Sequence, residues 1–313
     1  MNGLELSQAY FDEFGMPMLK ERFPELLPLL CAGLTGSGSE CYGYDDAISR
    51  DHDFEPGFCL FLPDESVIDR KTAFLLERAY AALPREYCGF RREITAPTGG
   101  ARKGVLRIGD FFTEKLGSPD GTLSMEQWLT LPEYALAEAT NGSLFYDGFG
   151  LVTRIRRRIS AYPDDVRLKR LAGNLLLMAQ AGQYNFRRCI GHGEPAAAQL
   201  AVIEFVDRAM AAIFLLNRKY QPFYKWRFRA FRALPLLGEL ADALAYLLCS
   251  GNEPAEVERK AALIERISVS VTETLVDQRL AGRGDPDLET HAYAVNDRIR
   301  DPNLRNQHIL TAV

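Results

Sequence analysis

The hydrophobic pattern of this chain changes close to residue 150, and that change limits the folds that the sequence can adopt. Before it, short apolar runs such as DHDFEPGFCLFLP (51–63), GVLRI (104–108) and SLFYDG (143–148) alternate with helical stretches. After it, apolar residues repeat at helical spacing and no stretch alternates convincingly like a strand. The sequence therefore predicts an α+β fold, with a mixed sheet flanked by helices followed by an all-helical domain.

The length of the chain and the change of pattern suggest how it divides into domains. The 313 residues, 47% of them hydrophobic, are enough for more than one core. We expect a mixed domain over 1–150, a helical domain over 151–285 and a polar C-terminal extension over 286–313. The clearest helices are predicted at 67–83, 133–140, 166–181, 195–219, 236–249 and 254–281.

Composition excludes several classes of protein. The net charge of -5 gives no overall attraction to nucleic acid or to anionic membranes, so no dedicated DNA binding is expected. The six cysteines form no CxxC pair, and the first residues lack the basic and apolar pattern of a signal peptide. The most apolar stretch, 200–216, contains three charged residues and is predicted to be a buried helix. We expect a cytoplasmic protein without membrane contact.

One segment, GSGSECYGYDDAISRDHDF (36–54), carries a chemical pattern. Its two acids, Asp51 and Asp53, stand one residue apart, so on a strand they would project from the same face. Two carboxylates on one face can share hard cations such as Mg²⁺. Both are therefore candidate metal ligands and catalytic residues.

The Gly-Ser turn of the same segment supplies a complementary half. Glycine lets the backbone approach a phosphate closely, and amides at the start of a helix are anion donors. Gly38 and Ser39 are candidate phosphate-binding residues, and Gly36 and Ser37 fit the spacing almost as well. Metal-binding carboxylates beside phosphate-binding amides suit in-line nucleotidyl transfer. The alternative is an ordinary turn followed by surface acids.

This segment resembles the signature of the nucleotidyltransferase superfamily that includes DNA polymerase beta, the aminoglycoside nucleotidyltransferases and the minimal nucleotidyltransferases of toxin-antitoxin systems. In the match, Gly38 and Ser39 take the Gly-Ser positions, Gly43 takes the second glycine, and Asp51 and Asp53 take the metal-binding acids. The resemblance implies Mg²⁺ as cofactor and ATP or another nucleoside triphosphate as substrate.

The sequence is also similar to an uncharacterised bacterial branch of that superfamily, a domain of unknown function with a helical C-terminal domain. The similarity lies in GSGSE, GYDD, SRDHDF, FYDG and RKYQPFYKW, and would cover about 33–234.

Members of the superfamily usually carry a third carboxylate on a later strand. GVLRI contains no acid, which leaves Asp110 just beyond it, or Glu93 in the preceding strand candidate, as substitutes. Either acid also fits a simpler interpretation, as a helix N-terminal charge or a surface residue. Asp110 is the predicted third catalytic residue.

A second candidate binding segment is NRKYQPFYKWRFRAFR (217–232), where basic residues stand among aromatic ones. Such side chains can bind a triphosphate, stack a base or grip RNA. Lys225 is the predicted nucleotide contact. The same pattern also fits an amphipathic helix with an aromatic inner face and a solvated basic outer face.

Taken together, these residues predict transfer of a nucleoside monophosphate, AMP from ATP by superfamily expectation, to a hydroxyl of a small molecule, protein or RNA. Three alternatives stay open at this point: a nucleotide-binding module without turnover, an antitoxin-like partner of another chain, and an RNA-binding helical protein.

Overall fold

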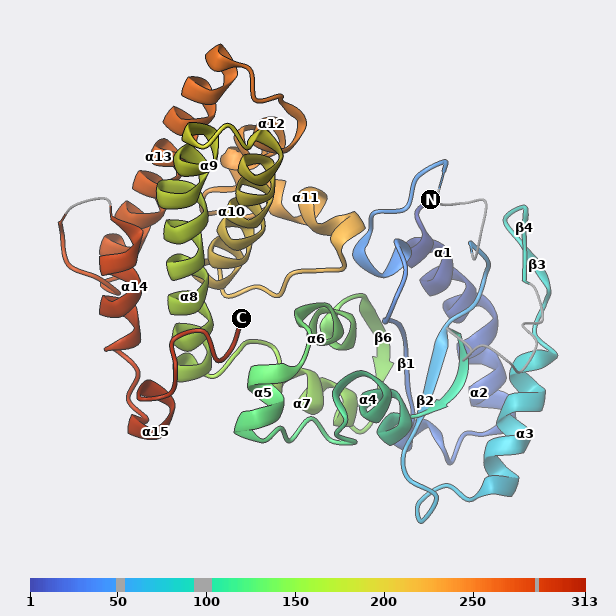
Figure 1. The fold of residues 1–313 in the computed structure, drawn as a ribbon. Coiled ribbons are helices and arrows are strands. Elements are labelled where there is room, and N and C mark those ends of the chain that lie inside the picture. The colour runs from blue at the N-terminus through green and yellow to red at the C-terminus, as the bar shows by residue number, and fades with distance from the viewer. Residues whose placement is uncertain (49–53, 93–102, 285–286) are drawn as a thin grey trace. The chain divides into compact units, whose positions relative to one another are not determined.

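A computed structural model describes residues 1–48, 54–92, 103–284 and 287–313 (Figure 1). The chain forms two compact units. The first contains Met1–Ser124 and Leu131–Ser160, and the second contains Met125–Thr130 and Ala161–Val313. The first unit holds a mixed sheet with helices, and the second is largely helical, so the predicted α+β class is confirmed.

The first unit is built on a four-stranded sheet of order β5-β2-β1-β6. Its strands are β1 (Cys31–Leu34), β2 (Cys59–Leu62), β5 (Gly104–Arg107) and β6 (Ser143–Asp147). Strand β1 runs antiparallel to β2 and β6, while β2 and β5 are parallel. The C-terminal end of β1 therefore lies at the same end of the sheet as the first residues of the other three strands, and the candidate site is at this edge.

Side chains on β2 alternate between two cores, as the strand period requires. Leu60 and Leu62 belong to the core that helices α1 to α3 cover. Phe61 lies on the other face, where its ring packs edge-on against Phe111 of α4 at 5.2 Å. The helices of this unit are α1 (Gly3–Tyr10), α2 (Met16–Arg22), α3 (Arg70–Ala81), α4 (Ile108–Leu116), α6 (Glu133–Thr140) and α7 (Leu151–Arg158).

The predicted strand over 51–63 is shorter in the structure than in the sequence pattern. Residues 54–58 are irregular, and β2 begins at Cys59. Pro56 has no N–H for a strand ladder. The Tyr80 hydroxyl accepts a hydrogen bond from the Phe58 N–H (3.0 Å) and donates one to the Phe58 carbonyl (2.8 Å). The Phe58 N–H, which would extend β2, is thus bonded to a side chain of α3, while the Phe58 carbonyl also accepts from the Gly104 N–H of β5 at 2.9 Å. Residues 86–91 form a small hairpin of β3 (Glu86–Tyr87) and β4 (Phe90–Arg91).

The second unit is a bundle in which α8 (Asp164–Met178) packs against α10 (Pro195–Leu216) and α14 (Leu288–Asn296). Lys169 of α8 is fully buried, and its ammonium donates to the Gln307 carbonyl (2.7 Å) and to the Asn296 side chain (3.0 Å). The segment predicted as an extension thus forms helices that pack on α8. The remaining helices are α5 (Met125–Thr130), α9 (Phe186–Gly191), α11 (Tyr224–Arg232), α12 (Ala241–Cys249), α13 (Pro254–Asp277) and α15 (Pro302–Arg305).

Two further features concern the cysteines and the apolar helices. All six cysteines are free thiols, and burial raises the pKa of Cys31. None of the helices within the described part of the chain is long and apolar enough to span a bilayer.

Candidate functional site

The Gly-Ser turn follows directly from the C-terminal end of β1. Gly36 and Gly38 have φ values of 113° and 133°, a region that glycine adopts readily and other residues rarely do. After the turn, Ser39 leads into one 3₁₀ turn, Glu40–Tyr42. The glycines predicted from the sequence thus let the backbone turn away sharply from the sheet.

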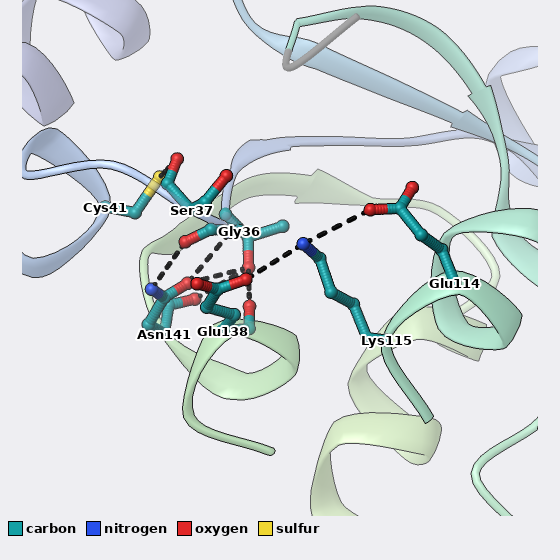
Figure 2. Close-up of polar contacts among 8 residues, drawn as sticks. Gly36, Ser37, Cys41, Glu114, Lys115, Glu138 and Asn141 are labelled. Carbon is teal, nitrogen blue, oxygen red and sulfur yellow. Dashed lines mark hydrogen bonds and ion pairs between the residues drawn. The ribbon is translucent and has the colours of Figure 1, made fainter. Parts of the chain in front are cut away.

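Asn141 holds this turn in place. Its side-chain oxygen accepts from the Gly36 N–H (2.9 Å), and its amide donates back to the Gly36 carbonyl (2.8 Å) (Figure 2). Thr35 adds bonds from its hydroxyl to the carbonyl of Glu138 (3.2 Å) and to that of Asn141 (3.0 Å). Asn141 immediately follows α6, so the end of that helix is tied to the beginning of the turn. Two opposed hydrogen bonds fix the amide plane of Asn141 and the backbone of Gly36 together.

Three side chains hold the segment that leads into β2 at the same edge of the sheet. The Ser7 hydroxyl donates to the Gly57 carbonyl at 2.7 Å. The Lys103 ammonium donates to the Glu55 carbonyl at 2.8 Å and lies 4.0 Å from a carboxylate oxygen of Glu40, and both charged side chains are almost fully buried. Together with Tyr80 on Phe58, these contacts fix the course of the chain immediately after residue 54.

A pocket of about 340 Å³ opens beside the Gly-Ser turn. Thr35, Gly36 and Ser37 form one wall, and residues of β5 and α4 form the other. Five of the lining side chains are charged: Glu77, Arg107, Asp110, Glu114 and Lys115. The pocket is therefore polar, with side chains of both signs of charge beside the Gly-Ser turn.

Lys115 of α4 lines this pocket and is paired with two carboxylates, one on α4 and one on α6 (Figure 2). Its ammonium lies 2.9 Å from a carboxylate oxygen of Glu138 and 3.3 Å from one of Glu114. Burial acts to lower the pKa of Lys115, but the hydrogen bond to Glu138 and the nearby negative charges leave that pKa raised overall. Lys115 is therefore a fixed positive charge next to the turn.

The structure brings some of the predicted site residues together. Gly36 and Ser37 line the pocket, and Asp110 lines it from the first turn of α4. Gly38 and Ser39 continue the same turn. Asp110 stands at a helix N-terminus, as the simpler interpretation of this acid expects, and its catalytic role stays a prediction.

The remaining predicted residues are Asp51, Asp53, Glu93 and Lys225. Asp51, Asp53 and Glu93 fall outside the described residues, and Asp53 directly precedes Phe54 in the sequence. Lys225 belongs to α11 in the second unit, where it is exposed and its ammonium lies 4.8 Å from the centre of the Trp226 ring. Its contact with a nucleotide stays a prediction. Within the described ranges, no three His, Cys, Asp or Glu side chains are close enough to share a metal ion.

Sequence reasoning missed Asn141, Lys115 and Lys103. Asn141 was detectable in part, because an Asn-Gly pair after a predicted helix marks a helix end and a turn. Its partner in space, however, is 105 residues earlier in the chain, and no local pattern reports such a pairing. Lys115 and Lys103 belong to no sequence motif, so no local pattern could have identified them as site residues.

Comparison with known proteins yields one family. Residues 128–227 match the model of a domain of unknown function (DUF4037). The match covers less than half of the chain, and it contains Asn141 together with the sequences FYDG (145–148) and RKYQPFYKW (218–226), but not the Gly-Ser turn. No curated protein matches this sequence.

Proposed function

We propose that this protein is a metal-dependent nucleotidyltransferase whose site lies at the edge of the sheet where β1 ends. One observation carries the proposal. The Gly-Ser turn closes β1, and the chain that follows Asp53 enters the antiparallel neighbour β2 at that same edge. A phosphate-binding turn and a carboxylate pair are both needed for this chemistry, and this topology favours their meeting at one edge.

In the proposed reaction, an acceptor hydroxyl attacks the α-phosphorus of a nucleoside triphosphate, the bond to the β-phosphate oxygen breaks, and pyrophosphate leaves. Asp51 and Asp53 would hold Mg²⁺, which neutralises charge on the phosphates. The turn from Gly36 to Ser39 would bind phosphate oxygens through its backbone and hydroxyls. ATP as the donor follows from the resemblance to the superfamily.

Roles for the pocket residues follow from their charges. Lys115 provides a fixed positive charge beside the turn, suited to the phosphates of the substrate. Asp110, in the same pocket, is the proposed third carboxylate. In that role it would accept the proton of the attacking hydroxyl.

The test is pyrophosphate release from each nucleoside triphosphate with Mg²⁺, with a cell extract as a pool of acceptors. We expect release by the wild type and a loss of at least about 100-fold in the Asp51→Asn/Asp53→Asn variant, because both proposed metal ligands lose their charge. Glu65→Gln, an exposed carboxylate paired with Arg70, is the matched control and should retain full activity.

Two outcomes of this test would contradict the proposed transferase activity. Equal release by the wild type and the double variant would mean a contaminating activity and would remove the proposal. ATP binding that depends on Asp51 and Asp53 without any release would favour a nucleotide-binding module. Asp110→Asn then tests the third carboxylate, since loss of turnover with unchanged ATP affinity is expected only if this acid acts in the chemical step.

A further inference from the structure

A second charged pocket lies wholly within the helical unit. It has a volume of about 610 Å³ and is formed around the start of α8, the residues that follow α10 and α13, and the segment between α14 and α15. Three aspartates and five arginines line it, the arginines being Arg167, Arg218, Arg279, Arg298 and Arg300. In a chain with a net charge of -5, such a concentration of guanidinium groups is a local feature, not a result of composition.

The three carboxylates of this pocket already have partners. Asp165 accepts from the backbone N–H of Arg300 (3.1 Å) and of Asp301 (2.9 Å). Asp301 caps α15 through the backbone N–H of Asn303 at 2.8 Å. Asp164 accepts from Arg218 at 2.8 Å. Two carboxylates are thus bonded to backbone groups, and five guanidinium groups leave an excess of positive charge.

Arg167 is the deepest of the five arginines. It is only 4% exposed, and its Nε and Nη1 have no hydrogen-bond partner among the residues that the structure describes. Its Nε lies 3.7 Å from the Asp164 oxygen that also accepts from Arg218, so two guanidinium groups share one carboxylate. A buried cation whose hydrogen-bond donors have no acceptor lowers the stability of the fold. Both atoms are also shielded from solvent, so Arg167 contributes a buried positive charge beside the pocket, and this charge would stabilise an anion bound there.

The backbone at two other arginines gives an independent indication. Arg218 and Arg279 have φ values of 53° and 58°, and each follows the C-cap of a helix, at the position where glycine is usual. Both are in the same motif: the N–H of Lys219 bonds the Phe214 carbonyl, and that of Leu280 bonds the Leu275 carbonyl. A basic residue one position earlier would serve the helix dipole without a left-handed backbone.

We propose that this pocket binds a small anion that carries two or more phosphate groups. One guanidinium group can donate two parallel hydrogen bonds to two phosphate oxygens. Several arginines around one pocket therefore suit a ligand that carries several negative charges. A pocket of about 610 Å³ is in the size range of small-molecule sites. Binding of such an anion would account both for the left-handed backbone at Arg218 and Arg279 and for the burial of Arg167. This inference does not depend on the proposed transferase activity.

Binding of tripolyphosphate to the full chain tests the proposal, measured by calorimetry with EDTA present so that no metal–triphosphate complex forms. The central variant is Arg218→Gly/Arg279→Gly. Because glycine suits both backbone positions, we expect its melting temperature to match or exceed that of the wild type. Its affinity for tripolyphosphate should fall at least about tenfold, since two charged donors are lost. Arg188→Gln/Arg266→Gln removes two exposed charges of the same unit outside the pocket and should keep the wild-type affinity.

Several results would overturn the proposal: no binding of tripolyphosphate by the wild type, equal affinity in the glycine variant, or an equal loss in the control variant. Citrate bound as tightly as tripolyphosphate would refute phosphate recognition. A short RNA bound more tightly, with the same dependence on Arg218 and Arg279, would replace the small anion by a nucleic acid. If the glycine variant is less stable than the wild type, Arg298→Gln/Arg300→Gln takes its place, with the same expected loss of affinity.

Discussion

At the scale of single residues, the side chain of Asn141 is the main support of the candidate site. It forms two opposed hydrogen bonds with Gly36 and accepts a third from the Thr35 hydroxyl at 3.1 Å. We predict that Asn141→Ala lowers the free energy of unfolding by about 1–3 kcal/mol, because the backbone of a part-buried turn loses its partners. Urea unfolding measures this loss, and amide exchange should show faster exchange of the Gly36 N–H.

Thr35→Val is the matched control for that prediction. It keeps the shape of the side chain and the pair between Asn141 and Gly36, and it should cost about 1 kcal/mol without opening the turn. Unchanged exchange of the Gly36 N–H in Asn141→Ala would contradict the assigned role of Asn141.

A second prediction at this scale concerns acid. Backbone and hydroxyl hydrogen bonds from Thr122, with further bonds from Ser118 and Arg158, lower the pKa of Asp120 from 3.8 to about 2. A lowered carboxyl pKa in the folded state stabilises the fold above the unfolded value, and this contribution is lost as the pH falls from about 4 towards about 2. Asp120 is largely exposed, so we expect less than about 1 kcal/mol after solvent screening.

The variant Asp120→Asn removes the contribution of the Asp120 carboxylate to stability. It should be slightly less stable than the wild type at pH 7 and should lose less stability between pH 4 and pH 2. Urea unfolding at a series of pH values provides the comparison, and parallel pH curves for the two proteins would show that Asp120 makes no such contribution.

At the scale of elements, the pairing of β1 with β6 depends on Gly142. A Cβ built on Gly142 would lie 1.9 Å from the Leu34 carbonyl oxygen, and φ at this position is 68°. Gly43 has almost the same φ, 66°, but a Cβ there would meet nothing within 4 Å. The two glycines therefore separate the cost of backbone conformation from the cost of a steric clash.

We predict that Gly43→Ala costs about 1 kcal/mol of unfolding free energy, the cost of a left-handed residue with a side chain. Gly142→Ala should cost clearly more, about 3 kcal/mol or above, because the strands must move apart as well. Chemical unfolding of both variants tests this order. Equal losses would mean that β1 and β6 tolerate the extra atom.

Local sequence patterns predicted elements well where the signal is local. The helix expected over 133–140 has those bounds in α6, and the strand and turn expected over 143–148 correspond to β6. The strand expected over 51–63 was too long, since the Phe58 N–H bonds to the Tyr80 hydroxyl, 22 residues away, and not to a neighbouring strand. The Gly-Ser turn was visible for the same local reason, whereas its bond to Asn141 was not.

At the scale of the whole molecule, the order of elements along the chain differs from their grouping in space. Helix α5 stands between segments of the first unit, yet it belongs to the second. Arg170 of α8 donates to the Leu129 carbonyl at 2.8 Å, and the Trp128 ring packs edge-on against Tyr162 at 5.8 Å. A single boundary near residue 150 does not describe this arrangement, because no periodicity reports which unit a short helix joins.

Helix α5 therefore gives a test of how the two units depend on each other. Trp128 is 8% exposed, and Trp128→Ala should lower the stability of the helical unit by about 3–5 kcal/mol, because a large buried side chain is removed. Phe112 of α4 is fully buried in the first unit and is the reciprocal control. Hydrogen exchange followed by mass spectrometry reports each unit separately.

In Trp128→Ala, we expect faster exchange over α8, where Arg170 anchors α5, and little change over β1 and β6. In Phe112→Ala, the pattern should be reversed, with faster exchange over β5 and α4. The physical reason is that each substitution removes contacts within one unit, so the opening free energy of that unit falls first. If both variants accelerate exchange equally over α8 and over the sheet, the two units unfold as one cooperative body. The expectation that each unit opens independently would then be wrong.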